Sequence, residues 1–114
     1  MKAIIELGKR GSLFSEVRAQ LEGTSPADYH LSFESARKLF SELTPARFDL
    51  LETLRNTGSC SIYALAKVAE RNYSNVHGDI ARLIDLGLVE RAEDDTVCVP
   101  FDDVEVHFHL AKAA

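Results

Sequence analysis

The sequence predicts a mainly α-helical fold with a small β wing: a winged helix-turn-helix domain preceded by an N-terminal α/β dimerisation arm. Three observations predict it. Two segments with helical apolar spacing flank a short turn at residues 71–73, a Leu-Gly-Leu-Val run ends the second segment, and two alternating segments then enclose an acidic tip. We expect residues 1–43 to form the arm, residues 44–110 the winged domain and residues 111–114 a tail.

Length and composition are those of one small domain. The chain has 114 residues, of which 46% are hydrophobic and 27% charged, as in ordinary globular proteins. No apolar run reaches the roughly 18 residues of a membrane span, and the N-terminus lacks the apolar stretch of a signal peptide. We therefore expect a cytoplasmic protein that does not bind membranes. The two cysteines form no Cys-x-x-Cys pair, which excludes a disulfide scaffold.

The formal net charge of −5 is concentrated near the C-terminus. Residues 92–114 carry six acidic side chains and one basic side chain, whereas residues 1–91 carry twelve of each sign. A neutral body permits short-range contacts with DNA, because charges in physiological salt act over about 8–10 Å. The strongly basic footprint of many nucleic-acid-binding domains is nevertheless absent.

The arm alternates strand and helix patterns. We expect strands at residues 2–7 and 29–33 and helices at residues 12–21 and 35–43. The apolar positions of the arm exceed what so small a body can bury, which predicts a homodimer interface there. These positions are Ile4, Ile5, Leu13, Phe14, Val17, Leu39 and Phe40.

Three helices and a hairpin are expected in the winged domain. The helices span residues 45–55, 62–69 and 75–86, and a last alternating strand covers residues 104–110. The hairpin has its arms at residues 88–92 and 96–100 and an acidic tip, Glu93-Asp94-Asp95, between them. A polar capping residue precedes each helix: Thr44, Ser61 and Ser74.

The third helix of this domain is the predicted DNA-recognition helix. Its apolar stripe packs on the second helix and leaves a polar face free for the major groove, where short polar donors and arginine read base edges and phosphates. The residues expected to contact DNA are Tyr73, Ser74, Asn75, His77, Gly78 and Arg82, with Arg71 in the turn and Arg91 at the base of the wing. The alternative is a protein-interaction module whose polar face is merely solvated.

Four runs of the chain carry a family resemblance: Tyr29–Ser35, Leu43–Leu51, Asn75–Ile80 and Leu86–Glu90. They resemble a family of small prokaryotic predicted transcriptional regulators whose winged-helix domain is related to the MarR and ArsR groups. The resemblance implies a cytoplasmic repressor that binds double-stranded DNA as a dimer. Because some relatives are expected beside toxin genes, it also implies an antitoxin role with a toxin protein as partner.

The chain departs from that family pattern at two places. Gly78 stands where a basic residue is expected, so one phosphate or base contact is missing. The three carboxylates at the tip, Glu93-Asp94-Asp95, would repel a phosphate backbone, and Arg91 is the only nearby cation. Both departures predict weaker DNA binding than the family pattern implies.

Two further hypotheses concern single residues. Cys60 and Cys98 lie in segments that can pair in a winged domain, so a redox switch is one hypothesis and two small buried hydrophobes the alternative. Glu105, His107 and His109 share one face of the last strand and would bind Zn²⁺ or Ni²⁺ only with further ligands, so an exposed strand face is the alternative.

No catalytic motif is present, and we expect neither an enzyme nor a cofactor nor a resident metal. Two functional classes remain. The first is a dimeric, sequence-specific regulator of transcription. The second is an antitoxin or other interaction module that holds a basic partner protein through the arm or through the acidic residues Asp102, Asp103 and Glu105, with weak or no DNA binding of its own.

Overall fold

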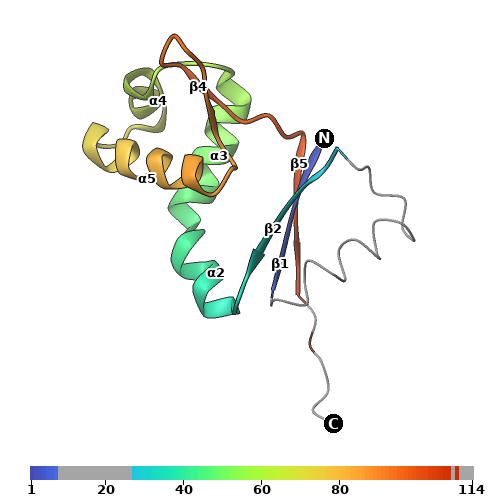
Figure 1. Ribbon diagram of the computed structural model, residues 1–114. Coiled ribbons are helices and arrows are strands. Elements are labelled where there is room, and N and C mark those ends of the chain that lie inside the picture. The colour runs from blue at the N-terminus through green and yellow to red at the C-terminus, as the bar shows by residue number, and fades with distance from the viewer. Residues whose placement is uncertain (8–26, 109, 111–114) are drawn as a thin grey trace. The chain divides into compact units, whose positions relative to one another are not determined.

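The computed structural model describes residues 1–7, 27–108 and 110, which belong to two compact units. Unit 1 combines Met1–Ser41 with Phe101–Ala114, and unit 2 is Glu42–Pro100. The elements in chain order are β1 (Lys2–Leu7), β2 (Tyr29–Phe33), α2 (Ala36–Glu42), α3 (Pro45–Thr57), α4 (Ile62–Ala69), α5 (Tyr73–Asp85), β3 (Glu90–Arg91), β4 (Val97–Cys98) and β5 (Asp103–His107) (Figure 1).

Unit 1 is built on a three-stranded sheet in the order β2-β1-β5, with both pairs of strands parallel (Figure 1). Ile5 of the central strand is in register with Leu31 of β2 and with Val106 of β5. The run Ala3–Glu6 is buried throughout, as is typical of a central strand covered on both faces.

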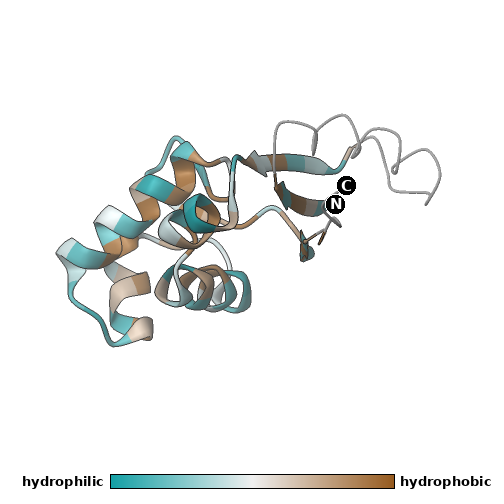
Figure 2. Cartoon of the chain, turned by 90° about the horizontal axis from the view of Figure 1, so that it is seen from below, coloured by the Kyte–Doolittle hydropathy of each residue, from teal (hydrophilic) through white to brown (hydrophobic). Residues whose placement is uncertain are grey.

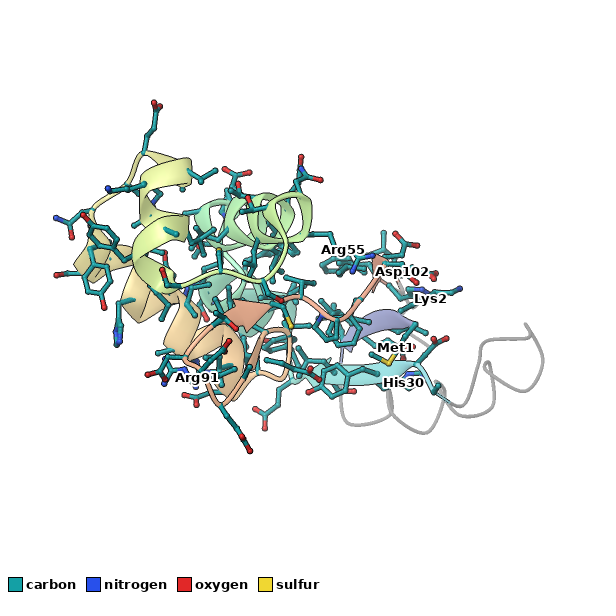
Figure 3. The ribbon with its side chains drawn as sticks, turned by 90° about the horizontal axis from the view of Figure 1, so that it is seen from above. Met1, Lys2, His30, Arg55, Arg91 and Asp102 are labelled. Atoms are coloured by element: carbon teal, nitrogen blue, oxygen red, sulfur yellow. The ribbon has the colours of Figure 1, made fainter. Side chains whose placement is uncertain are left out.

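Polar contacts connect the start of β1 to β5 on one side and to the residue before β2 on the other. The N-terminal ammonium group lies 3.0 Å from the Asp102 carboxylate, and the Lys2 ammonium group lies 2.9 Å from that of Glu105. The backbone N–H of Lys2 donates to Oδ1 of the buried Asp28 at 2.9 Å. Figure 3 shows Met1, Lys2 and Asp102 together at this end of the sheet.

This sheet overturns the predicted fold class. The protein is a mixture of α and β structure with a parallel sheet that joins the two ends of the chain, and not a mainly α winged helix-turn-helix. The alternation at residues 104–110 correctly indicated a strand, which spans Asp103–His107. A period of two does not specify the partner strand, however, and the partner is β1, which lies outside the winged domain to which this strand was assigned.

Unit 2 packs its three helices α3, α4 and α5 around a leucine-rich core. The longer helices α3 and α5 each have an apolar side and a polar side, whereas α4 is apolar along most of its length (Figure 2). The core side chains that are at most 1% exposed are Leu43, Leu50, Leu54, Leu65, Val76, Ile80, Leu83, Leu88 and Val97. The predicted caps of α3 and α4 are confirmed, because the side-chain oxygens of Thr44 and Ser61 accept from the N–H groups three residues later.

The cap of α5 differs from the prediction. Oδ1 of Asn72 accepts from the Asn75 N–H at 3.2 Å, so α5 begins at Tyr73 and Ser74 lies in its first turn. Asparagine and serine cap helices about equally well, and residue preference alone therefore did not distinguish Asn72 from Ser74.

The hairpin after α5 is short, with two residues in each strand. Cys60 forms an isolated antiparallel bridge with Val97, and the two backbones exchange hydrogen bonds of 3.2 and 2.8 Å. The expected pairing of these segments is thus confirmed. Cys60 and Cys98 are both free and half-buried, and burial raises the pKa of the Cys60 thiol, which lowers its thiolate fraction at neutral pH. The redox switch stays a hypothesis.

Some predictions concern residues outside those described. They are the helix at residues 12–21 with its apolar positions Leu13, Phe14 and Val17, the possible metal ligand His109 and the tail 111–114. Among the helices that the structure does describe, none is long and apolar enough to cross a membrane.

Two glycines of unit 2 provide a matched test of this fold. Gly58 ends α3 at φ +83° and donates its N–H to the Leu54 carbonyl, whereas Gly78 lies in the middle of α5. No atom lies within 4 Å of a Cβ added at either position, so only backbone conformation matters.

Gly58→Ala should lower the free energy of unfolding by about 1–3 kcal/mol, because side chains disfavour that φ and ψ. Gly78→Ala should raise it by about 0.5–1 kcal/mol, because alanine is the better helix former. Urea denaturation of both variants measures the two changes. Effects of the same sign would contradict the backbone described here.

Candidate nucleic-acid interface

Helix α5 divides cleanly into a buried side and an exposed side. Val76, Ile80 and Leu83 are fully buried, at the three- and four-residue spacing of one helix face. The predicted contact residues Tyr73, Ser74, Asn75, His77 and Gly78 are all exposed and belong to the N-terminal half of the helix. The free polar face on which the DNA prediction depends is therefore present.

Arg71, just before α5, is held by a carboxylate. Its Nη2 donates to Oδ2 of Asp79 at 2.8 Å, and Nε of Arg47 in α3 donates to Oδ1 of the same carboxylate at 3.0 Å. The Asp79 side chain is only 19% exposed, and both arginine side chains are half-buried. Asp79 thus joins the first turn of α3 and the segment before α5 to the middle of α5.

The pKa of Asp79 reflects this arrangement. Burial opposes ionisation and by itself raises the pKa, but the hydrogen bonds and positive charges of Arg71 and Arg47 outweigh burial and lower the pKa below its usual value. The carboxylate is therefore ionised at neutral pH and balances one of the two arginine charges.

Arg82 is held in a similar way. Its Nε donates to Oε2 of Glu42, a side chain that is only 13% exposed, and its Nη1 lies 3.8 Å from Asp85. Nη1 of Arg47 also donates to the Glu42 backbone carbonyl at 2.7 Å. Alternating charges therefore run from Arg82 through Glu42 and Arg47 to Asp79.

Sequence reasoning missed Arg47, Asp79 and Glu42. Asp79 stands between the inward-facing Val76 and Ile80, and a carboxylate beside an apolar stripe signals a partner. Arg47 lies 32 positions away in the chain, and no local pattern links the two. Their pairing becomes visible only when α3 and α5 are packed together.

Two hollows border the N-terminal half of α5, and the predicted contact residues are divided between their linings. The first, of about 520 Å³, and the second, of about 290 Å³, together contain every predicted contact residue except Arg82. The first is lined by Thr44, Ala46, Arg47, Arg71, Ser74, Asn75, Gly78 and Asp79. The second is lined by Ser61, Ile62, Tyr63, Tyr73, His77, Arg91 and Asp95.

Aromatic rings and cations surround the second hollow. The ring centroids of Tyr63 and Tyr73 are 6.3 Å apart, and those of Tyr73 and His77 are 5.8 Å apart. Lys67 places its ammonium group 4.7 Å from the centroid of Tyr63, a cation–π contact. Arg91 is exposed on the hairpin (Figure 3).

The acidic tip of the hairpin is exposed, and one of its carboxylates has a structural role. Oδ1 of Asp94 accepts hydrogen bonds from the hydroxyl and the backbone N–H of Thr96, at 2.7 and 3.1 Å, and these bonds lower the pKa of Asp94. Asp95 adopts φ +65°, a conformation that aspartate tolerates better than most residues. Turn chemistry therefore accounts for part of the negative charge there.

The residues of the metal hypothesis are engaged with one another. Nε2 of His107 lies 3.3 Å from Oε1 of Glu105, whose other oxygen faces the Lys2 ammonium group. Among the described residues, no three His, Cys, Asp or Glu side chains converge to hold a metal ion. Binding of Zn²⁺ or Ni²⁺ stays a hypothesis that needs ligands from elsewhere.

Comparison with known proteins places the chain in one family. A family model described as HVO_A0114 matches residues 42–106, more than half of the sequence, and the chain belongs to this family. The match begins where unit 2 begins and ends within β5. No curated protein and no solved structure matches the chain.

The Asp79 carboxylate should make a pH-dependent contribution to stability. At pH 7, Asp79→Asn should lower the free energy of unfolding by about 1–3 kcal/mol, the range for hydrogen bonds to charged groups. Because the folded pKa is depressed, this contribution is complete above the unfolded pKa of about 3.9 and is lost as the pH falls through the folded pKa.

Urea denaturation of both proteins at pH 7 and near pH 3 measures this effect, with Asp49→Asn, an exposed position on α3, as the control. The difference between wild type and Asp79→Asn should shrink at the lower pH. A difference that stays constant with pH would contradict the role assigned to the carboxylate.

Proposed function

We propose that this HVO_A0114-family chain is a sequence-specific DNA-binding regulator of transcription, acting as a repressor in the cytoplasm, with the exposed side of α5 as its reading surface. One observation carries the proposal. Val76 and Ile80 are buried on one side of α5. On the other side, five positions near the start of the helix are exposed: Tyr73, Ser74, Asn75, His77 and Gly78. A helix presented in this way fits the major groove of B-form DNA.

The chemistry of the exposed side chains supports base recognition. The Asn75 amide can both donate and accept, which suits the N6 and N7 edge of adenine. Ser74 offers a hydroxyl, and the backbone N–H groups of the first turn offer donors for a phosphate oxygen. Arg91, exposed on the hairpin beside the second hollow, adds a cation for the DNA backbone.

Arg71 and Arg82 have a different role in this proposal. Both were expected to contact DNA, but each is already bound to a carboxylate, Arg71 to Asp79 and Arg82 to Glu42. We assign them as positioning residues, which fix α5 against the rest of unit 2. The residues that touch DNA are then Tyr73, Ser74, Asn75, His77 and Arg91.

A dimer supports useful affinity in a protein with so little positive charge. The exposed carboxylates of the hairpin tip, Glu93-Asp94-Asp95, repel phosphate groups and leave little net attraction to DNA for each protomer. Two copies on a palindromic site double the contacts.

Unit 1 is the expected dimer interface. Of the described positions predicted for it, Ile4, Ile5 and Leu39 are buried within the protomer, contrary to the expectation, and Phe40 is 57% exposed. Phe40 stacks at 5.7 Å on Phe108, which is 41% exposed, and this pair is an apolar surface available to a second copy.

Binding to the DNA upstream of the protein's own gene tests the proposal. Fluorescence anisotropy at two salt concentrations should show salt-sensitive binding that prefers this DNA over an unrelated duplex. Asn75→Ala should reduce that preference by about 1–3 kcal/mol, the range for one bidentate base contact, without changing stability.

Two variants serve as controls for this measurement. Arg37→Ala, at an exposed position of unit 1, should leave binding unchanged. Arg82→Ala should lower the free energy of unfolding, because the hydrogen bond from Arg82 to the half-buried Glu42 carboxylate is lost, in contrast to Asn75→Ala. If the wild-type protein binds no DNA even at low salt, the proposal is wrong and a basic protein partner, such as a toxin, becomes the next candidate.

Gly78 allows a gain-of-function test of the same surface. It is exposed on α5, and a Cβ added there meets no other part of the protein within 4 Å, so a longer side chain starts from open space. Gly78→Arg should strengthen DNA binding and increase the magnitude of the salt slope by about one, as expected for one added phosphate contact. Gly78→Gln, of similar length but neutral, is the control, and equal binding by the two variants would place this position away from DNA.

A further inference from the structure

We propose that the second hollow is a nucleobase-stacking site that takes one unpaired nucleotide of DNA. The inference rests on the proposed DNA binding and specifies the form of DNA that the protein prefers, namely one in which a base has left the helical stack. The observation behind it is the row of rings that crosses from α4 to α5 through Tyr63, Tyr73 and His77.

The rings of this row are available to a ligand. Tyr63 is 59% exposed and Tyr73 is 48% exposed, so both present a large aromatic surface to solvent. The two tyrosine rings are tilted by 53°, and Tyr73 is tilted by 45° from His77. Rings tilted in this way are not stacked on one another. Lys67 lies over one face of Tyr63, and the exposed fractions show that part of each tyrosine ring remains accessible to a further planar group.

The core of unit 2 does not account for these tyrosines. Leu65, Ala66 and Val76 of α4 and α5 are buried in the core of unit 2, whereas the contact between the rings of Tyr63 and Tyr73 lies at the surface. The third tyrosine of the chain, Tyr29, shows the contrasting situation, because it is half-buried and stacks at 5.7 Å on the buried Phe101. Tyr63 and Tyr73 are therefore surface residues, and we infer that they serve to bind a ligand.

The charges around the rings match a nucleotide. Lys67 lies over the ring of Tyr63, and Arg91 lines the hollow, so two cations lie near the rings for the phosphate groups that flank a base. Asp95 also lines the hollow and can accept a hydrogen bond from an exocyclic amino group. With a volume of about 290 Å³ the hollow lies at the small end of ligand sites, which suits a single nucleotide.

Stacking requires a base whose face is free. In a duplex, each base is covered above and below by its neighbours, so a protein ring at the groove cannot reach a base face. An unpaired base exposes its faces, and stacking on a tyrosine then stabilises the complex whatever the base sequence. Tyr73 starts the reading helix α5, so a base stacked there lies beside the surface proposed to read the duplex.

The test compares two DNAs of the same sequence, one fully paired and one with a single extra, unpaired adenine at its centre. Fluorescence anisotropy with the full-length protein should show that the bulged DNA binds about fivefold or more tightly than the paired DNA. Tyr63→Leu and Tyr73→Leu should abolish this preference. Tyr63→Phe and Tyr73→Phe should keep it, because they keep the ring.

Three controls make the result decisive. Val68→Ala, at an exposed position of α4 that does not line the hollow, should keep the preference. Thermal unfolding of the leucine variants identifies a loss of fold, in which case the phenylalanine variants carry the test. Deoxyadenosine monophosphate, added as a competitor, distinguishes a free nucleotide from a nucleotide in DNA. If it displaces the bulged DNA at micromolar concentration, the hollow is a site for free nucleotides rather than for a base in DNA.

The outcomes separate this inference from the proposed function. Equal binding of the paired and bulged DNAs, or a preference that survives both leucine variants, overturns the stacking site and leaves DNA binding intact. Failure of both DNAs to bind overturns the proposed function and the stacking site with it. A preference for the bulge that depends on the rings supports both.

Discussion

The Asp79 carboxylate accepts hydrogen bonds from Arg47, 32 positions away in α3, and from Arg71, just before α5, and so connects α3 with both the start and the middle of the α5 segment. The apolar core alone would allow α5 to rotate or slide slightly, because dispersion and burial are not directional. Hydrogen bonds from two arginines to one carboxylate, by contrast, require a specific geometry. The orientation of the exposed side of α5 therefore depends on this one group, and the Arg82–Glu42 pair supports it from the C-terminal half of the helix.

The same network determines how much positive charge unit 2 can offer to a ligand. Arg71 and Arg82, both close to α5, form ion pairs with carboxylates of the protein itself. Recognition must then depend on neutral donors and on rings, with Lys67 and Arg91 as the cations beside the second hollow. Such a surface suits selective contacts of modest strength, because long-range attraction to phosphates contributes little.

Local features of the chain were predictable and distant pairings were not. The bounds of α4 were predicted to the residue, and the caps Thr44 and Ser61 follow from short-range rules that a single sequence carries. The exposed residues of α5 follow from helical periodicity. The partner of β5 and the partner of Asp79 depend on packing between segments, so the fold class was wrong and the network that orients the site was missed.

The parallel pairing of β1 with β5 has a consequence for folding. The N-terminal ammonium group meets Asp102, a separation of 101 positions, so β1 stays without its neighbour β5 until residues 103–107 have been synthesised. Contacts of such high contact order form slowly. Unit 2 lies between the two strands in sequence and is a compact unit formed from one continuous segment, so it can fold before β5 emerges from the ribosome. The last strand to emerge then completes the sheet.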